Sequence, residues 1–164
     1  MKKGVVLAGG LGTRLLPLTK VTNKHLLPVH GRPIIYYPLE MLAKAGIEEV
    51  LLVTGGESAG EFLRLLGDGR EFSLRWLTYA YQAQAGGIAE ALALARPFVR
   101  DEPFMVVLGD NLVERSVRAG ADAFRKQGTG ARIFLKEVPD PEKFGVAEVG
   151  ILTVSAAASK SLYG

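Results

Sequence analysis

The sequence predicts an α/β fold, in which helices cover both faces of a mainly parallel (mixed) sheet. Apolar runs of strand length alternate with stretches of helical periodicity along most of the 164 residues. The strand-like runs are continuously apolar, which is typical of strands buried on both sides. Together these patterns indicate a three-layer α/β/α arrangement, whose ligands bind beyond the carboxyl ends of the strands.

The expected elements follow one another from the first residues. Residues 4–8 form an apolar strand that leads directly into a glycine loop. A helix is expected at 34–45, because Pro33 suits the start of a helix and Gly46 is typical of a C-cap. Residues 49–54 form a second buried strand.

A short helix is expected at 58–66, with Ser58 as its N-cap and Glu61 completing a capping box. A turn through Gly67, Asp68 and Gly69 follows this helix. The remaining elements are expected as a strand at 74–80, a helix at 88–95, a strand at 104–108, a helix at 116–126, and strands at 131–138 and 146–149.

Composition narrows the class of protein. The hydrophobic share of 48% and the absence of cysteine describe a globular chain without disulfides or thiolate metal sites. The apolar runs are shorter than a membrane span and the first residues do not resemble a signal peptide, so a cytoplasmic enzyme is expected. Three glutamines and two asparagines among many glutamates and arginines favour a heat-stable (thermophile) source.

A net charge of +3 suits a small anionic substrate. Lysine and arginine are scattered along the chain, and no aromatic ladder accompanies them, so the sequence predicts no nucleic acid partner and no membrane partner.

The glycine loop at 7–15 and the lysine that follows it carry the main functional signal. Bare backbone N–H groups can hold phosphate oxygens, while Arg14 and Lys24 can balance the charge of a polyphosphate. A Walker loop is excluded because the string Gly-x4-Gly-Lys-Ser/Thr does not occur, and a dinucleotide fingerprint is excluded because Leu15 occupies the position of the third glycine. These residues predict a nucleoside-triphosphate site.

The chain resembles the sugar-phosphate nucleotidylyltransferases, and among them it is most similar to the thymidylyltransferases. The resemblance covers residues 1–149 and implies a Rossmann-like sheet of the nucleotidyltransferase type. The matching strings stand in family order at 7–15, 23–29, 33–39, 66–69, 108–111 and 144–146.

The resemblance implies that the protein transfers a nucleotidyl group from dTTP to a sugar 1-phosphate, with glucose 1-phosphate as the expected acceptor and Mg²⁺ as cofactor. Arg14 and Lys24 are implied as catalytic residues, with Lys24 on the side of the sugar phosphate. Asp110 is implied as the metal ligand and Gly145 as a sugar-phosphate contact. The implied nucleotide-binding residues are Leu7, Gly9, Gly10, Gly12, Thr13, Arg14, Gln82 and Gly87.

The chain departs from the family pattern in two places. His25 stands where many thymidylyltransferases have glutamine, and the loop at 81–87 differs from the usual base-side sequence. Residues 150–164 match nothing in the pattern and indicate a frayed or artefactual tail. The family continues beyond this length, so we expect the nucleotide-binding half of a longer enzyme, a homo-oligomer by resemblance, that binds dTTP or UTP but turns over poorly.

Two other functions remain open from the sequence. A uridylyltransferase, or a transferase for another sugar phosphate, would use the same residues with a different base or acceptor. A non-catalytic nucleotide-binding module would keep the glycine loop without turnover.

Overall fold

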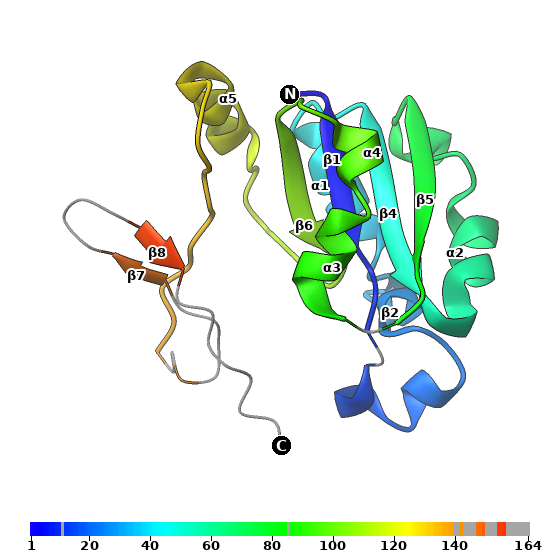
Figure 1. Cartoon of the computed structure of the whole chain (residues 1–164). Coiled ribbons are helices and arrows are strands. Elements are labelled where there is room, and N and C mark those ends of the chain that lie inside the picture. The colour runs from blue at the N-terminus through cyan, green and yellow to red at the C-terminus, as the bar shows by residue number, and fades with distance from the viewer. Residues whose placement is uncertain (11, 85, 140–141, 143–146, 150–153, 157–164) are drawn as a thin grey trace. The chain divides into compact units, whose positions relative to one another are not determined.

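The computed structural model describes residues 1–10, 12–84, 86–139, 142, 147–149 and 154–156, with the backbone alone at 57, 147–149 and 154–156. The chain divides into two compact units, Met1–Gly128 and Thr129–Gly164. Figure 1 shows the elements of both units.

A four-stranded sheet forms the centre of the first unit. Its strands are β1 (Lys3–Leu7), β4 (Glu49–Gly55), β5 (Trp76–Gln82) and β6 (Phe104–Leu108), in the order β5-β4-β1-β6. All three pairings between neighbouring strands are parallel. The predicted mainly parallel sheet is therefore confirmed, and residues 104–108 form a strand with the predicted ends.

Helices cover both faces of this sheet. Successive residues of each strand point to opposite faces, and the apolar side chains on each face are buried against helices. On one face, Val6 of β1 and Ala8, which directly follows β1, pack against α1 (Tyr36–Lys44) and α2 (Ala59–Leu66). On the other face, Val5 and Leu7 pack against α3 (Gly87–Ala93) and α4 (Arg96–Val99). Figure 1 shows α3 and α4 in front of the strands and α1 behind them. The three layers are those expected from the sequence.

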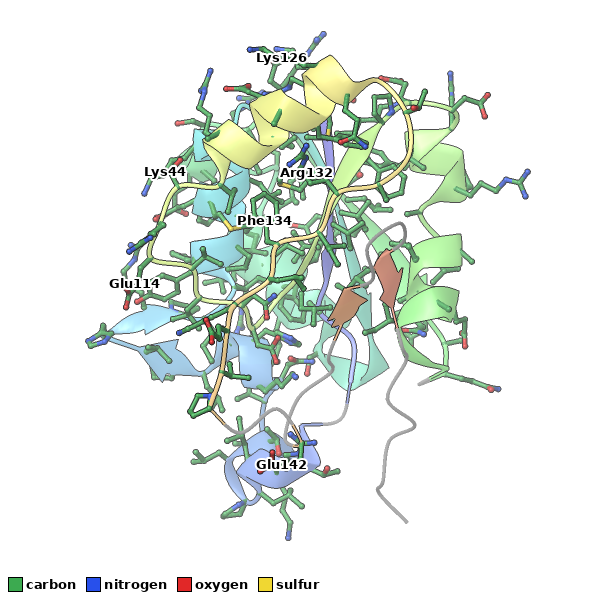
Figure 2. The ribbon with its side chains drawn as sticks, turned by 90° about the vertical axis from the view of Figure 1, so that its left-hand side faces the viewer. Lys44, Glu114, Lys126, Arg132, Phe134 and Glu142 are labelled. Carbon is green, nitrogen blue, oxygen red and sulfur yellow. The ribbon has the colours of Figure 1, made fainter. Side chains whose placement is uncertain are left out.

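The last helix of the first unit, α5 (Arg118–Gln127), is tied to the end of α1. The Arg125 guanidinium donates to the carbonyl oxygens of Ala45 and Met1, each at 3.1 Å. The Ala45 carbonyl is one of the groups that the end of α1 leaves without an intrahelical partner. The labelled side chains of Lys44 and Lys126 lie at the protein surface near these two helices (Figure 2).

Short elements connect the strands and helices. They are the 3₁₀ turns η1 (Thr13–Leu15), η2 (Leu18–Lys20), η3 (Lys24–Leu26), η4 (Gly56–Ser58) and η5 (Arg70–Phe72), and the hairpin of β2 (Pro28–Val29) with β3 (Arg32–Pro33).

The predicted capping box at the start of α2 is wrong. Ser58 precedes the helix but makes no side-chain cap bond, because η4 leads into α2 and leaves Ser58 at φ −84° and ψ 0° instead of the extended conformation of an N-cap. The Glu61 carboxylate instead accepts a hydrogen bond of 3.2 Å from the Thr22 hydroxyl. Glu61 thus joins α2 to the segment that follows the glycine loop.

The strand predicted at 131–138 is also wrong, since these residues form no regular element. The apolar side chains of Ile133, Phe134 and Leu135 are each at least half exposed, and Phe134 is labelled in Figure 2. An apolar run becomes a strand only when a neighbouring strand supplies its hydrogen-bonding partners, and the described part of the chain contains no such pairing for this run.

The second unit contains a small antiparallel pair. It joins β7 (Ala147–Val149), where a strand was predicted, to β8 (Val154–Ala156), which the sequence did not predict. Residue 146 lies outside the described residues. Within the part of the chain that is described, no helix is both long and apolar enough to cross a membrane.

One buried hydroxyl group stands out in the core. The Thr54 side chain on β4 is 2% exposed, and among the described residues its Oγ1 is the one buried side-chain polar atom without a hydrogen-bond partner. A buried polar group without a partner destabilises the folded state, because it gives up its bonds to water without replacing them.

We therefore predict that Thr54→Val, which keeps the shape and removes the hydroxyl, raises the free energy of unfolding by about 1–2 kcal/mol. Urea denaturation measures this change. The matched control is Thr78→Val on β5, because the Thr78 hydroxyl is exposed and already donates to the Val50 carbonyl at 3.3 Å. A loss of stability in Thr54→Val would show that the hydroxyl has a partner in solution.

Candidate functional site

A cavity of about 260 Å³ opens at the carboxyl edge of the sheet. Its walls come from the ends of three strands, from the glycine loop and from the first turns of α3. The residues that line it are Leu7, Gly9, Gly10, Lys24, His25, Gln82, Gly87, Ile88, Ala91, Leu108 and Asp110. The cavity lies where the parallel sheet predicts a ligand site.

The glycine loop leaves β1 beneath this cavity. At Gly12 the backbone is left-handed, with φ of +60°, and the Gly12 carbonyl accepts a hydrogen bond of 2.9 Å from the Thr19 hydroxyl. A Cβ at position 12 would lie 2.8 Å from Thr19 Cγ2 and 3.2 Å from Lys24 Cβ. Only glycine fits there without displacing the segment that carries Lys24.

Lys24 and Asp110 meet at the cavity although they are distant in the sequence. The Lys24 ammonium donates to Asp110 Oδ2 at 2.7 Å. Lys24 stands on η3, while Asp110 follows β6 in a turn where the Asn111 amide donates to the Leu108 carbonyl. This pair places one cation and one carboxylate side by side at the same wall.

Competing effects act on the carboxyl group of Asp110. Burial alone would raise its pKa, but the hydrogen bond from Lys24, followed by the charges of Lys24 and His25, lowers the pKa below its ordinary value. The carboxylate is therefore ionised at neutral pH and can accept hydrogen bonds or bind a cation.

His25 lies beneath this pair and is 1% exposed. The Asn23 side-chain oxygen accepts from the His25 amide at 3.1 Å and lies 2.6 Å from the ring Nδ1. Because an amide oxygen only accepts, we assign the ring proton to Nδ1. Burial, and then the charge of Lys24, lower the pKa of His25 to about 4 against the opposing effect of Asp110. The ring is therefore neutral at pH 7.

A glycine makes room for the His25 ring. A Cβ built on Gly109 would lie 2.8 Å from His25 Cδ2 and 3.2 Å from both His25 Nε2 and Ile35 Cδ1. The Gly109 amide also donates to the Leu7 carbonyl at 2.8 Å, which fixes this turn against β1. The close approach therefore explains the glycine between Leu108 and Asp110.

Gln82 closes the opposite side of the cavity at the end of β5. Its amide nitrogen donates to the Gly87 carbonyl at 3.3 Å, and a Cβ on Gly9 would lie 2.9 Å from its amide oxygen. The two residues predicted to contact the base, Gln82 and Gly87, are thus hydrogen-bonded to each other.

The structure brings most of the predicted site residues together, while their roles remain predictions. Seven of them line the cavity: Leu7, Gly9, Gly10, Lys24, Gln82, Gly87 and Asp110. Gly12 contacts the segment before Lys24, whereas Thr13 and Arg14 are exposed on η1 and are not among the lining residues. Gly145 lies outside the described residues.

Four lining residues were not predicted from the sequence as members of the site: His25, Ile88, Ala91 and Leu108. The spacing of Ile88 and Ala91 places them on one face of α3, which is the signal that could have indicated them. Gly109 could have indicated that a side chain such as His25 packs against the turn after β6, since a glycine beside a strand end indicates a close neighbour.

The described residues contain no group of three or more histidine, cysteine, aspartate or glutamate side chains that could hold a metal ion. Among the described residues that line the cavity, Asp110 is the one that carries a carboxylate.

Comparison with known proteins identifies related sequences. Residues 3–160 match the family model described as nucleotidyl transferase. A glucose-1-phosphate thymidylyltransferase of Neisseria meningitidis is 42% identical over 147 residues, which are 89% of this chain and 51% of that protein. The enzyme of the same name from Xanthomonas campestris pv. campestris is 44% identical over 151 residues, or 90% of this chain and 50% of that protein. The chain spans about half the length of these curated relatives.

Solved structures agree in fold. A Bacillus anthracis structure assigned as a glucose-1-phosphate thymidylyltransferase has a TM-score of 0.88 at 44% identity, and the match covers 93% of this chain and 61% of that one. A UDP-glucose pyrophosphorylase complexed with UDP-glucose has a TM-score of 0.65 at 27% identity, covering 78% and 55%. The predicted Rossmann-like fold of the nucleotidyltransferase type is confirmed.

The buried neutral His25 makes stability depend on pH. Between about pH 4 and pH 6.5 the unfolded chain binds a proton at residue 25 that the folded chain does not, so stability falls as the pH falls through this window. We predict a loss of about 3 kcal/mol from His25 between pH 7 and pH 4. Urea denaturation at a series of pH values above 4.5 measures most of this loss without the contribution of Asp110.

The variant His25→Gln is expected to flatten this pH dependence. The chain has two histidines, and the exposed His30 supplies the control, because His30→Asn should leave the slope unchanged. An equal slope in His25→Gln and the parent protein would contradict the assignment.

The contact between Gly109 and the His25 ring yields a second prediction. Gly109→Ala should lower the free energy of unfolding by about 1–3 kcal/mol, because the ring, held by Asn23, has to move. Thermal denaturation compares this variant with Gly60→Ala on α2, where an added Cβ would meet nothing within 4 Å and should stabilise the helix by up to about 1 kcal/mol. Equal effects of the two substitutions would refute the contact.

Proposed function

The chain belongs to the nucleotidyl transferase family, and we propose that it forms the nucleotide-binding part of an enzyme that transfers a thymidylyl group from dTTP to a sugar 1-phosphate. The observation that carries this proposal is the pair of Lys24 and Asp110 at 2.7 Å, facing the cavity that the glycine loop borders. Glucose 1-phosphate is the acceptor named by the relatives, and we propose it for this chain.

The reaction needs positioning and charge balance, and it needs no protein nucleophile. A phosphate oxygen of the sugar 1-phosphate attacks the α-phosphorus of dTTP, the bond from that phosphorus to the bridging oxygen breaks, and pyrophosphate leaves with the bonding electrons. Both reactants are anions that repel each other. Lys24 holds the attacking phosphate near the α-phosphate, and Arg14 holds the triphosphate with its planar guanidinium.

Asp110 fits one position in the coordination of Mg²⁺. This ion usually binds one or two protein carboxylates together with substrate phosphates and water, and the ionised, partly exposed Asp110 supplies such a carboxylate. A bound Mg²⁺ would offset the charge of the triphosphate. The hydrogen bond from Lys24 holds the Asp110 carboxylate at the cavity wall.

Gln82 is proposed to contact the base. A glutamine amide offers one donor and one acceptor side, which suits the edge of either thymine or uracil. UTP is therefore a second candidate donor, and the likeness to a pyrophosphorylase complexed with UDP-glucose supports it. Competition between dTTP and UTP for the protein distinguishes the two nucleotides.

We propose that the enzyme is cytoplasmic and comes from a heat-stable source. The absence of cysteine agrees with a cytoplasmic location, and the low glutamine and asparagine content agrees with a heat-stable source. We propose a homo-oligomer, as the family resemblance implies, and size-exclusion chromatography with light scattering would test it.

Nucleotide binding can be measured directly by calorimetry with dTTP, in the presence and absence of Mg²⁺. We predict micromolar binding to the parent protein and a loss of about 10- to 100-fold in Arg14→Ala, because charge-assisted hydrogen bonds to phosphate disappear. Asp110→Asn should remove the part of the affinity that depends on Mg²⁺.

The control for Arg14→Ala is Arg64→Ala, which removes an equally exposed arginine that stands on α2 and not on the glycine loop. Equal affinities of these two variants would contradict the role of Arg14. Mg²⁺-dependent release of pyrophosphate from dTTP and glucose 1-phosphate would support catalysis, whereas binding without any release would favour the non-catalytic module.

A further inference from the structure

All three methionines of the chain pack against one small apolar cluster at α5. The buried members of this cluster are Ala45 at the end of α1, Val117, and Ala121 of α5. Among the described residues, the partly buried apolar side chains that pack against it are Met1, Met41 and Met105. Met41 belongs to α1 and Met105 to β6, so the fold brings the three methionines to one place from distant parts of the sequence.

The same three side chains also pack against the main core on the α1 face of the sheet. They therefore link α5 to that core. The helix itself supplies little apolar bulk, since Ala121 is the one buried residue among the described residues of α5, and Val117 directly precedes the helix. The apolar attachment of α5 to the rest of the protein thus depends on methionine side chains.

Polar bonds join α5 to the same segments of the chain. Arg125 donates to the carbonyl groups of Met1 and Ala45, and the Arg118 guanidinium donates to the Lys44 carbonyl at 3.5 Å. The Arg118 side chain is exposed, so water competes for its bond. These bonds orient the helix, and the apolar contact with the methionines holds it against the core.

The reactive group in this contact is the thioether sulfur. The chain contains no cysteine, so its methionines hold its only sulfur atoms, and all three are partly exposed to solvent. Hydrogen peroxide converts a thioether to a sulfoxide. The sulfur lone pair attacks one peroxide oxygen, the O–O bond breaks, and the other oxygen leaves as water with the proton of the transferred oxygen. Sulfur loses two electrons and the peroxide gains them.

We propose that Met1, Met41 and Met105 form an oxidation site that controls the attachment of α5. A sulfoxide carries a polar oxygen that an apolar contact cannot satisfy, so oxidation removes the contact that holds the helix. The helix then separates from the end of α1, while the four-stranded sheet stays folded. Reduction of the sulfoxides restores the contact. This site does not depend on the proposed nucleotidyl transfer.

The test is hydrogen–deuterium exchange of the full chain before and after treatment with hydrogen peroxide, with mass spectrometry to count the oxygen atoms taken up at each methionine. We expect the amides of residues 118–127 to exchange about tenfold faster after oxidation, and those of β4 to stay unchanged. Methionine sulfoxide reductases should restore the slow exchange of the oxidised protein. Complete oxidation without faster exchange in α5 would overturn the proposal.

The double variant Met41→Leu/Met105→Leu keeps the apolar volume and removes two of the three sulfur atoms. Before treatment its α5 should exchange as in the parent protein, and after treatment most of the acceleration should be absent. Adding Leu63→Met supplies the control, because it places a methionine at an exposed position of α2, where oxidation should leave α5 unchanged.

Two further outcomes would also overturn the proposal. One is an equal acceleration of α5 exchange in the double variant and the parent protein. The other is a failure of peroxide to oxidise the three native methionines under conditions that oxidise the methionine introduced by Leu63→Met.

Discussion

The parallel pairing of β1 with strands on both of its sides is the constraint on which the rest of the structure depends. Leu7 is paired with Val53 on one side and with Leu108 on the other. Because the strands run in the same direction, the glycine loop after β1 and the turn that carries Asp110 leave the sheet at one edge. Lys24 can meet Asp110 only because this register brings together two residues that are 86 positions apart in the sequence.

The predictions that the structure confirms are those that depend on the local sequence alone. The strand at 104–108 has the predicted ends because its apolar run pairs in parallel with β1 along its whole length, with Val107 buried and Val106 40% exposed. The strand at 131–138 failed because an apolar run does not reveal whether a pairing partner is present. The cap at Ser58 failed because the preceding turn, η4, decides the backbone conformation there.

The same distinction between local sequence and three-dimensional contacts explains why only part of the site was predicted. Lys24 and Asp110 belong to short strings with a strong family pattern, so their residue types were sufficient to indicate phosphate chemistry. The burial of His25 was not predictable, because it results from the meeting of η3 with the turn after β6, and neither segment shows this meeting by itself. The exposure of Arg14 likewise depends on where η1 lies in three dimensions.

The glycines at the cavity have a consequence for how such a site changes over evolutionary time. Gly9 leaves room for the Gln82 amide, and Gly109 leaves room for the His25 ring. A side chain at either glycine is tolerated only after its neighbour has become smaller or has moved, so the order of substitutions matters. The positions in each pair are therefore expected to diverge together, and the glycines to change last. The contact in each pair therefore affects the order in which substitutions can occur. It also limits the intermediate sequences that are available to a descendant of this protein.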